Sequence, residues 1–239
     1  MNRDQQILDR DDQKKGGCRF LRVFYAPRQV FEEIAEKPAF LALALTLTVI
    51  NLVLVIVTLP KLQALAMHIF EQNPPPLPPE ELSRVRSSLP TQVAISSIIA
   101  SVLVPWIIWL LIALALKIYA AFATKETPFR ILFAVAVYGY LPVFLGSVIS
   151  FFLILSLPVQ SLQHVTLSLA AFLPPQKSIL YHFLAQCSPF TWWALALWGL
   201  GGATAMKVKS SGPILYMFGL WLLVALLLSA LSTLSPGAA

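Results

Sequence analysis

Apolar residues gather in five long runs that contain no Asp, Glu, Lys, Arg or His. A helix rises about 1.5 Å per residue, so about 20 apolar residues cross the ~30 Å hydrocarbon core of a bilayer. The pattern therefore predicts an all-α polytopic integral membrane bundle of five transmembrane helices. The five predicted spans are residues 39–59, 93–116, 131–157, 190–206 and 214–231.

Prolines mark the predicted helix starts. A proline costs little in the first turn of a helix, where the backbone N–H groups have no intrahelical partner. One proline stands shortly before each apolar run, and we expect the helices to begin there: Pro38, Pro90, Pro128, Pro189 and Pro213.

The third apolar run contains a helix-distorting step from Gly139 to Pro142. As a straight helix this run would reach about 40 Å, more than the bilayer core, so we expect a bend at Pro142. Pro105 lies at a similar depth in the second run. If these helices pack together, their released carbonyl groups and the hydroxyl groups of Tyr138 and Tyr140 would line a cavity, as in broken-helix transporters. The alternative, which we favour, is two kinked helices whose backbone groups are satisfied locally.

Polar residues predict the parts outside the membrane. Residues 1–19 are expected to form a disordered cytoplasmic tail, residues 20–233 one membrane domain, and residues 234–239 a flexible C-terminus. Two long loops are expected on the far side, residues 60–92, which include a proline tract, and residues 158–189.

Residues 20–37 predict a short amphipathic helix before the first span. Val30, Phe31 and Ile34 share one face, and acidic residues occupy the other. Such a helix can dock on the membrane or on a cytoplasmic partner, or it can pack against its own bundle. We favour packing, because an acidic face is poorly suited to anionic lipid.

Charge indicates the orientation. Of the 17 Lys and Arg residues, 13 fall on the side of this topology that holds residues 1–38, 117–130 and 207–213. Because cytoplasmic loops carry an excess of Lys and Arg, we expect the N-terminus in the cytoplasm and the C-terminus outside. The basic residues are not interleaved with stacking aromatics, so no nucleic-acid partner is expected. With 12% charged residues and a mean hydropathy of +0.77, the expected surroundings are the lipid bilayer.

Candidate catalytic chemistry is sparse. Ionisable residues inside a membrane mark proton relays and ion pathways, so their lack in the five runs argues against a proton-coupled transporter and an intramembrane protease. The histidines (His68, His164, His182) are widely spaced, and Cys18 and Cys187 fall on opposite sides of the predicted topology. We therefore expect no catalytic residue, metal site or cofactor, and no enzyme.

Two features of the spans predict helix packing. Asn51 in the first span can form a hydrogen bond to another helix or line a cavity, and we favour the former. Small residues in the fourth span let a neighbouring helix approach closely. They are Gly199, Gly201, Gly202, Ala203 and Ala205.

Three motifs, in this order, resemble the Yip-one domain family. They are the lead-in from Arg22-Val-Phe-Tyr-Ala-Pro27 to Lys37-Pro38, the step Tyr138-Gly-Tyr-Leu-Pro142, and Pro189-Phe190 to Trp192 followed by glycines. The family comprises multi-spanning membrane proteins that are named for interaction with Ypt/Rab GTPases in eukaryotes and are widespread in bacteria. The short N-terminal region resembles the bacterial branch, which implies the bacterial inner membrane and an accessory role in export or lipid handling.

Three functions are consistent with this reasoning. The leading hypothesis is a non-enzymatic scaffold or accessory subunit of a membrane transport, export or trafficking system, with a membrane protein such as an ABC-type exporter as partner. The second is a small transporter or channel with its pathway at the kinked second and third helices. The third is a GTPase-binding trafficking factor that uses residues 18–37.

Overall fold

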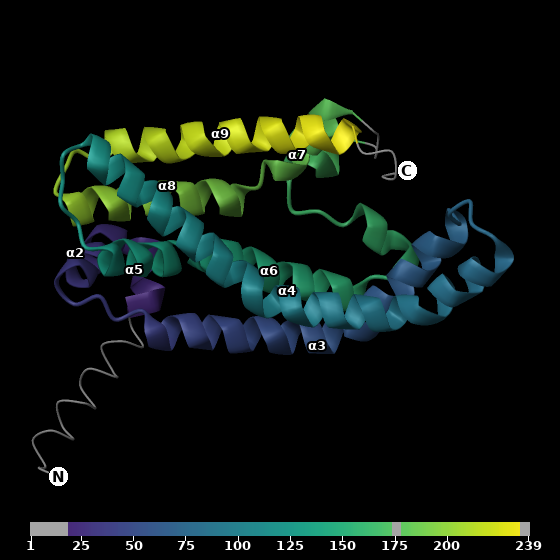
Figure 1. Ribbon diagram of the computed structural model, residues 1–239. Helices are drawn as coiled ribbons and strands as arrows, with labels where there is room; N and C mark the ends of the chain where they lie inside the picture. Colours follow the sequence, from purple (N-terminus) through teal and green to yellow (C-terminus); the bar gives the residue numbers. More distant parts are fainter. Residues whose placement is uncertain (1–18, 174–177, 235–239) are drawn as a thin grey trace, which may run out of the picture. The chain divides into compact units, whose positions relative to one another are not determined.

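The computed structural model describes residues 19–173 and 178–234, and every regular element in these residues is helical (Figure 1). The predicted all-α class is therefore confirmed. A short helical segment at residues 19–25 precedes α2 (Pro27–Glu36), α3 (Leu41–Gln72), α4 (Pro79–Phe122), α5 (Phe129–Gly139), α6 (Leu141–Ser156), η1 (Val159–His164), η2 (Leu169–Phe172), α7 (Ile179–Gln186), α8 (Pro189–Met206) and α9 (Ser211–Leu234).

Four helices among the described residues are long and apolar enough to cross a membrane. They are Leu41–Gln72, Pro79–Phe122, Phe129–Ser156 and Ser211–Ser232. The remaining predicted span corresponds to α8, an 18-residue helix with three tryptophans and three glycines, which lower its hydropathy. The helix is present, and its passage through the membrane stays a prediction.

The first two spans are longer than predicted, and the expected loop at residues 60–92 is wrong. α3 continues through Pro60 to Gln72, and α4 begins at Pro79 and continues through Pro90. Only residues 73–78 join the two helices. Pro90 is thus an interior residue and not a helix start, whereas the other four prolines stand at or within a few residues of one.

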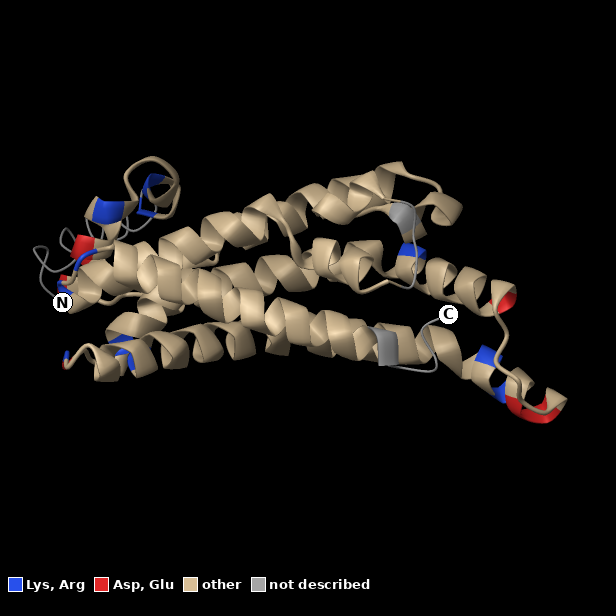
Figure 2. Ribbon diagram, turned by 90° about the horizontal axis from the view of Figure 1, so that it is seen from above, with Lys and Arg blue, Asp and Glu red and all other residues tan. Residues whose placement is uncertain are grey.

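Contacts between α3 and α4 explain why both helices continue past their prolines. The Gln63 side chain donates to Pro90 O at 3.0 Å, and Arg86 pairs with Glu71 at 2.6 Å. Such contacts offset the backbone hydrogen bond that an interior proline removes. Figure 2 shows the charged residues of this hairpin gathered near its turn, while the long stretches of helix are uncharged.

The predicted break in the third span is confirmed. α5 ends at Gly139, a turn follows at Tyr140, and α6 begins at Leu141. Pro142 lies in the first turn of α6, where its missing N–H leaves no intrahelical hydrogen bond unmade.

The described residues group into two compact units. The first unit consists of residues 19–44, 109–142 and 193–219, and the second of residues 45–108, 143–173, 178–192 and 220–234. Several helices, including α4 and α9, contribute residues to both units.

The first unit contains most of the large side chains that are fully buried. α2 packs on α5 (Figure 1), and Val30, Phe31 and Ile34 are completely buried. Packing of the amphipathic lead-in against its own bundle is therefore confirmed. Trp109 and Leu116 from the last turns of α4 complete this core.

The second unit buries fewer side chains. α3 and α4 contact each other here, and Trp106 Nε1 donates to Thr48 Oγ1 at 3.0 Å. Only 17% of the most apolar window of α3 and 22% of that of α4 is buried, compared with 61% for Phe129–Ser156. The apolar surface of these two helices therefore faces outward.

The two predicted tails are only partly described. Residues 1–18 and 235–239 lie outside the described residues, so the tail predictions apply to parts that the structure does not describe. Arg19 and Leu234, which belong to the predicted tails, are helical, and the Arg19 side chain pairs with Glu33 at 2.9 Å.

Candidate functional site

The indole group of Trp198 satisfies a backbone carbonyl group at the helix break between α5 and α6. In a regular helix the Tyr140 N–H would donate to Ala136 O. It donates to Val137 O at 3.3 Å instead, and Trp198 Nε1 of α8 donates to Ala136 O at 2.9 Å. A Cβ atom at Gly139 would collide with the same indole ring. Gly139 therefore leaves room for the side chain that satisfies the released carbonyl group.

The two tyrosines of this break have different surroundings. The Tyr138 hydroxyl donates to Ala39 O at 3.1 Å, which ties α5 to the residues just before α3. Tyr140 packs edge-on against Trp109, with ring centroids 5.7 Å apart. Both tyrosines are buried, as is Pro142.

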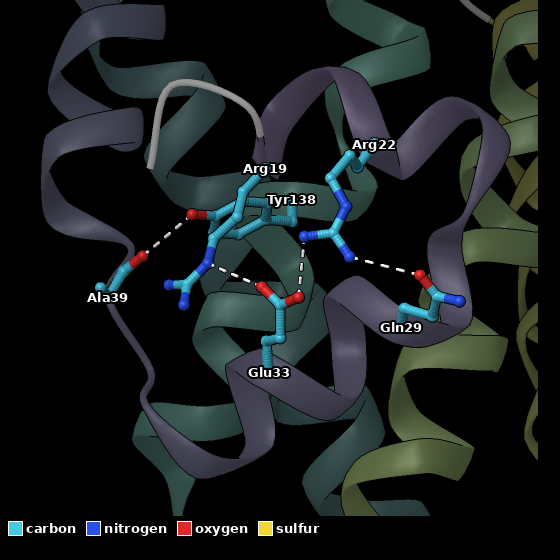
Figure 3. Close-up of polar contacts among 6 residues, drawn as sticks. All are labelled: Arg19, Arg22, Gln29, Glu33, Ala39 and Tyr138. Atoms are coloured by element: carbon cyan, nitrogen blue, oxygen red, sulfur yellow. Dashed lines mark hydrogen bonds and ion pairs between the residues drawn. The ribbon is translucent and has the colours of Figure 1, made fainter. Parts of the chain in front are cut away.

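A partly buried carboxylate, Glu33, joins the segment at residues 19–25 to α2 (Figure 3). Arg19 Nε donates to one carboxylate oxygen at 2.9 Å, and Arg22 donates to the other at 2.8 Å. A second nitrogen of Arg22 donates to Gln29 Oε1 at 3.3 Å. Because each oxygen of Glu33 has its own guanidinium donor, the cluster fixes the entry of the chain into the bundle.

A cleft of about 530 Å³ opens beside α2 in the first unit. Its charged rim consists of Arg28, Glu32 and Glu36 from α2 and Lys207 after α8. Arg28 and Glu32 form an exposed i, i+4 pair at 3.3 Å. The cleft thus presents positive and negative groups together, an arrangement suited to binding a polar partner rather than to covalent chemistry.

The end of α8 positions Lys207 at this rim. Lys207 has a φ of 54°, in the left-handed region that glycine usually occupies at this place in a helix. The next residue, Val208, donates its N–H to Ala203 O at 3.0 Å, which closes the helix end. The chain turns here so that the Lys207 side chain faces solvent beside the cleft.

A family model described as Yip1 domain matches residues 21–231. The chain belongs to the Yip1 domain family. The match covers nearly the whole chain and confirms the resemblance seen in its motifs. Together with the four long apolar helices, it identifies a multi-pass membrane protein. No curated protein and no solved structure matches the chain.

Within this Yip1 domain, the glycines of α8 lie at close approaches to other helices. A Cβ atom at Gly199 would lie 2.5 Å from Ile214 Cα of α9, and one at Gly201 would lie 2.6 Å from Val135 Cγ1 of α5. Contacts below 3.0 Å are not compatible with a real side chain unless the neighbour moves. A larger residue would therefore force these helices apart.

The remaining small residues of α8 have different surroundings. A Cβ atom at Gly202 would lie 2.7 Å from Leu116 Cδ2, at the end of a side chain that can shift. Ala203 is buried, and Ala205 is half-buried.

The second unit contains a helix cap that the sequence reasoning missed. Lys61 Nζ donates to three carbonyl oxygens at the end of α6, those of Ile154 at 2.9 Å, Leu155 at 2.7 Å and Leu157 at 2.7 Å. A lysine has three donors, so this ammonium group is fully used. The predicted loop at residues 60–92 would make Lys61 a loop residue, but it lies within α3 and compensates the terminal carbonyl groups of another helix.

Two other predicted site residues lie in the second unit, and their roles stay predictions. Asn51 is half-buried on α3, and its side chain makes no hydrogen bond to any residue that the structure describes. Pro105 is buried inside α4. A cavity shared by Pro105 and Pro142 stays a prediction, since α4 continues through Pro105 without a break and Pro142 belongs to the first unit.

Cys187 is buried before α8, and its thiol donates to Phe183 O at 3.4 Å. Burial raises the pKa of this thiol. Cys18 lies outside the described residues. Among the described part of the chain, no three His, Cys, Asp or Glu side chains lie close enough together to hold a metal ion.

The sequence offered signals for some of the residues that were missed. Arg28, Glu32 and Glu36 recur at intervals of four along α2, which places them on one face. Lys207 directly follows an apolar run, and a basic residue at such a position is typical of a helix end. No local pattern indicates that Trp198 donates to Ala136 O or that Lys61 caps α6, because both partners are distant in sequence.

Proposed function

We propose that this Yip1 domain protein is a non-enzymatic scaffold or accessory subunit of a membrane transport or export system. It spans the bacterial inner membrane five times, with the N-terminus in the cytoplasm and the C-terminus outside. Its partner is a membrane protein such as an ABC-type exporter.

The main support for an accessory role is the outward-facing apolar surface of the long helices. Only 17–22% of the most apolar window is buried in three of the four candidate spans. Val53 and Val57 of α3 are 51% and 49% exposed. In a bilayer such surfaces contact lipid or the helices of another membrane protein, where close packing drives association.

Exposed basic residues support the proposed orientation. Lys125 lies in the turn between α4 and α5, Arg130 lies at the start of α5, and both are exposed. Basic residues are enriched on the cytoplasmic side of a membrane, which agrees with a cytoplasmic turn.

The same reasoning supports a membrane passage by α8. Lys207 and Lys209 lie between α8 and α9, and both are exposed. If α8 did not cross, these two lysines would lie on the far side of the membrane, away from Lys125 and Arg130. The excess of positive charge in the cytoplasm therefore favours five spans over four.

Site-specific photocrosslinking in native membranes tests the accessory role. A photoreactive amino acid at Val53 or Val57 should give a discrete crosslink to a subunit of a transport system, identified by mass spectrometry. The same probe at Leu47, which is 3% exposed, is the matched control and should crosslink within the chain. If the exposed positions give only lipid adducts, and the protein extracted gently from these membranes carries no stoichiometric companion, the accessory role is wrong.

A further inference from the structure

The cleft beside α2 is bordered by two residues of opposite charge that form no ion pair within the described part of the chain. Glu36 and Lys207 border it from α2 and from the end of α8, and both side chains are exposed. Neither forms an ion pair with any other residue in the described part of the chain. A negative and a positive group are therefore available at one opening.

The other two charged groups of the rim are also available to a ligand. Among the described residues Arg28 and Glu32 form an ion pair only with each other, at 3.3 Å, and their side chains are 78% and 56% exposed. An exposed pair of this kind is weak, so either group can turn toward a bound molecule. The cleft can therefore present two carboxylates to a cation and two basic groups to an anion.

The remaining walls are mostly small or hydroxylated, with Val208 as an apolar member. Ala35 and Ala203 leave space between α2 and α8, Ser210 adds a hydroxyl group, and the Thr204 hydroxyl, which donates to Leu200 O at 2.9 Å, can still accept. The cleft volume of about 530 Å³ lies within the range of about 300–1,000 Å³ that is usual for small-molecule sites. The occupant that fits is a compact polar group rather than an apolar chain.

The place of the cleft in the chain indicates where such a group would come from. α2 leads through residues 37–40 into the first membrane helix, α3, and the other wall is the end of α8. One wall therefore directly precedes a candidate membrane span, and with the proposed membrane passage of α8 both walls would lie near the level of the lipid headgroups.

We propose that this cleft binds a molecule that carries a primary ammonium group and a phosphate, the chemistry of phosphoethanolamine. Glu36 and Glu32 accept hydrogen bonds from the ammonium group, and Lys207 and Arg28 donate to the phosphate. The source is either the headgroup of phosphatidylethanolamine or free phosphoethanolamine. This inference goes beyond the accessory role, and its test needs neither a companion protein nor a membrane topology.

Binding to the purified full chain in a maltoside detergent tests the proposal. The probes for titration calorimetry are dihexanoyl phosphatidylethanolamine, the matching choline and glycerol lipids, and phosphoethanolamine. We expect the ethanolamine lipid to bind about tenfold more tightly than the other two lipids, because choline cannot donate a hydrogen bond and glycerol carries no cation. Equal binding of phosphoethanolamine identifies the free compound as a ligand, and binding of the lipid alone identifies the headgroup.

Charge-neutralising variants locate the site. Glu36→Gln and Lys207→Met should each weaken binding of the ethanolamine lipid about tenfold. Glu126→Gln and Lys209→Met remove exposed charges outside the cleft and should leave the affinity unchanged. The proposal is overturned if the choline or the glycerol lipid binds as tightly as the ethanolamine lipid, if no probe binds, or if the cleft variants behave like their controls.

Discussion

The two units of this Yip1 domain protein are stabilised in different ways. In the first unit, helices approach so closely that glycines are required, and a buried indole satisfies a backbone carbonyl group. In the second unit, long apolar helices keep most of their surface exposed, and polar contacts such as Lys61 with the end of α6 hold the helices. The difference indicates that the first unit relies on its own packing, whereas the second relies on the membrane around it.

The largest loss of stability is expected in the first unit at Gly199, where the backbone of α8 lies close to that of α9. Gly199→Val should lower the free energy of unfolding by about 3 kcal/mol, since its Cβ would lie 2.5 Å from Ile214 Cα and neither helix can yield. Gly219→Val in α9 is the matched control, because a Cβ there meets nothing within 4 Å. Unfolding in mixed detergent micelles measures both. Equal losses would mean that the close approach of the helices at Gly199 does not cause the loss of stability.

In the second unit, the corresponding test is Lys61→Met. Three carbonyl groups at the end of α6 would lose their donor, which should cost about 2 kcal/mol. Lys125→Met removes an exposed charge and serves as the control, with little change expected. If Lys61→Met is as stable as the wild type, water replaces the ammonium group, and the polar cap does not stabilise this unit.

The indole donor of the first unit can be removed without a change in the hydrophobic character of the site. Trp198→Phe leaves Ala136 O without its side-chain donor and should cost about 1.5 kcal/mol. Trp193→Phe is the control, since Trp193 is 40% exposed and its ring packs edge-on against Phe24. Unchanged stability of Trp198→Phe would show that the α5–α6 break is satisfied in another way.

A smaller loss is expected at the entry of the chain. Glu33→Gln removes the charge that Arg19 and Arg22 share and should cost about 1 kcal/mol, less at high salt. Glu32→Gln, which affects only the exposed pair with Arg28, should change the stability by no more than about 0.5 kcal/mol. Thermal unfolding at low and high salt measures both, and a salt-independent loss would contradict an ionic cause.

The smallest effect concerns reactivity rather than stability. Burial raises the pKa of the Cys187 thiol, so less thiolate is present at neutral pH than for a free cysteine. In a Cys18→Ser background, maleimide should label Cys187 slowly at pH 7, and the rate should rise as the pH increases through that raised pKa. Rapid labelling at pH 7 that does not change on unfolding would show that Cys187 is accessible.

The sequence predicted the helices of this protein better than their ends. Apolar runs and the Gly139–Pro142 step identified the bundle and its break, because hydropathy and proline act locally. The prediction that this helix begins at Pro90 was wrong, because the contacts that keep α4 intact come from α3, far away in sequence. For the same reason, the cap formed by Lys61 could not be predicted.

The candidate site was predictable only in part. The spacing of Arg28, Glu32 and Glu36 places three charges on one face of α2, but the opposing wall depends on how α8 ends at Lys207. Sequence alone does not tell which helix end meets which surface. Tertiary packing therefore decides where the charged residues form a cleft.

Side-specific labelling of single cysteines most directly tests whether the chain crosses the membrane five times. In a background without Cys18 and Cys187, cysteines replace Asn73, Lys125 and Lys209, and intact cells are treated with a membrane-impermeant maleimide. We predict that position 73 reacts from outside, while positions 125 and 209 react only after the membrane is permeabilised. Labelling of position 209 from outside, together with protection of position 125, would mean that α8 does not cross and would contradict the five-span account.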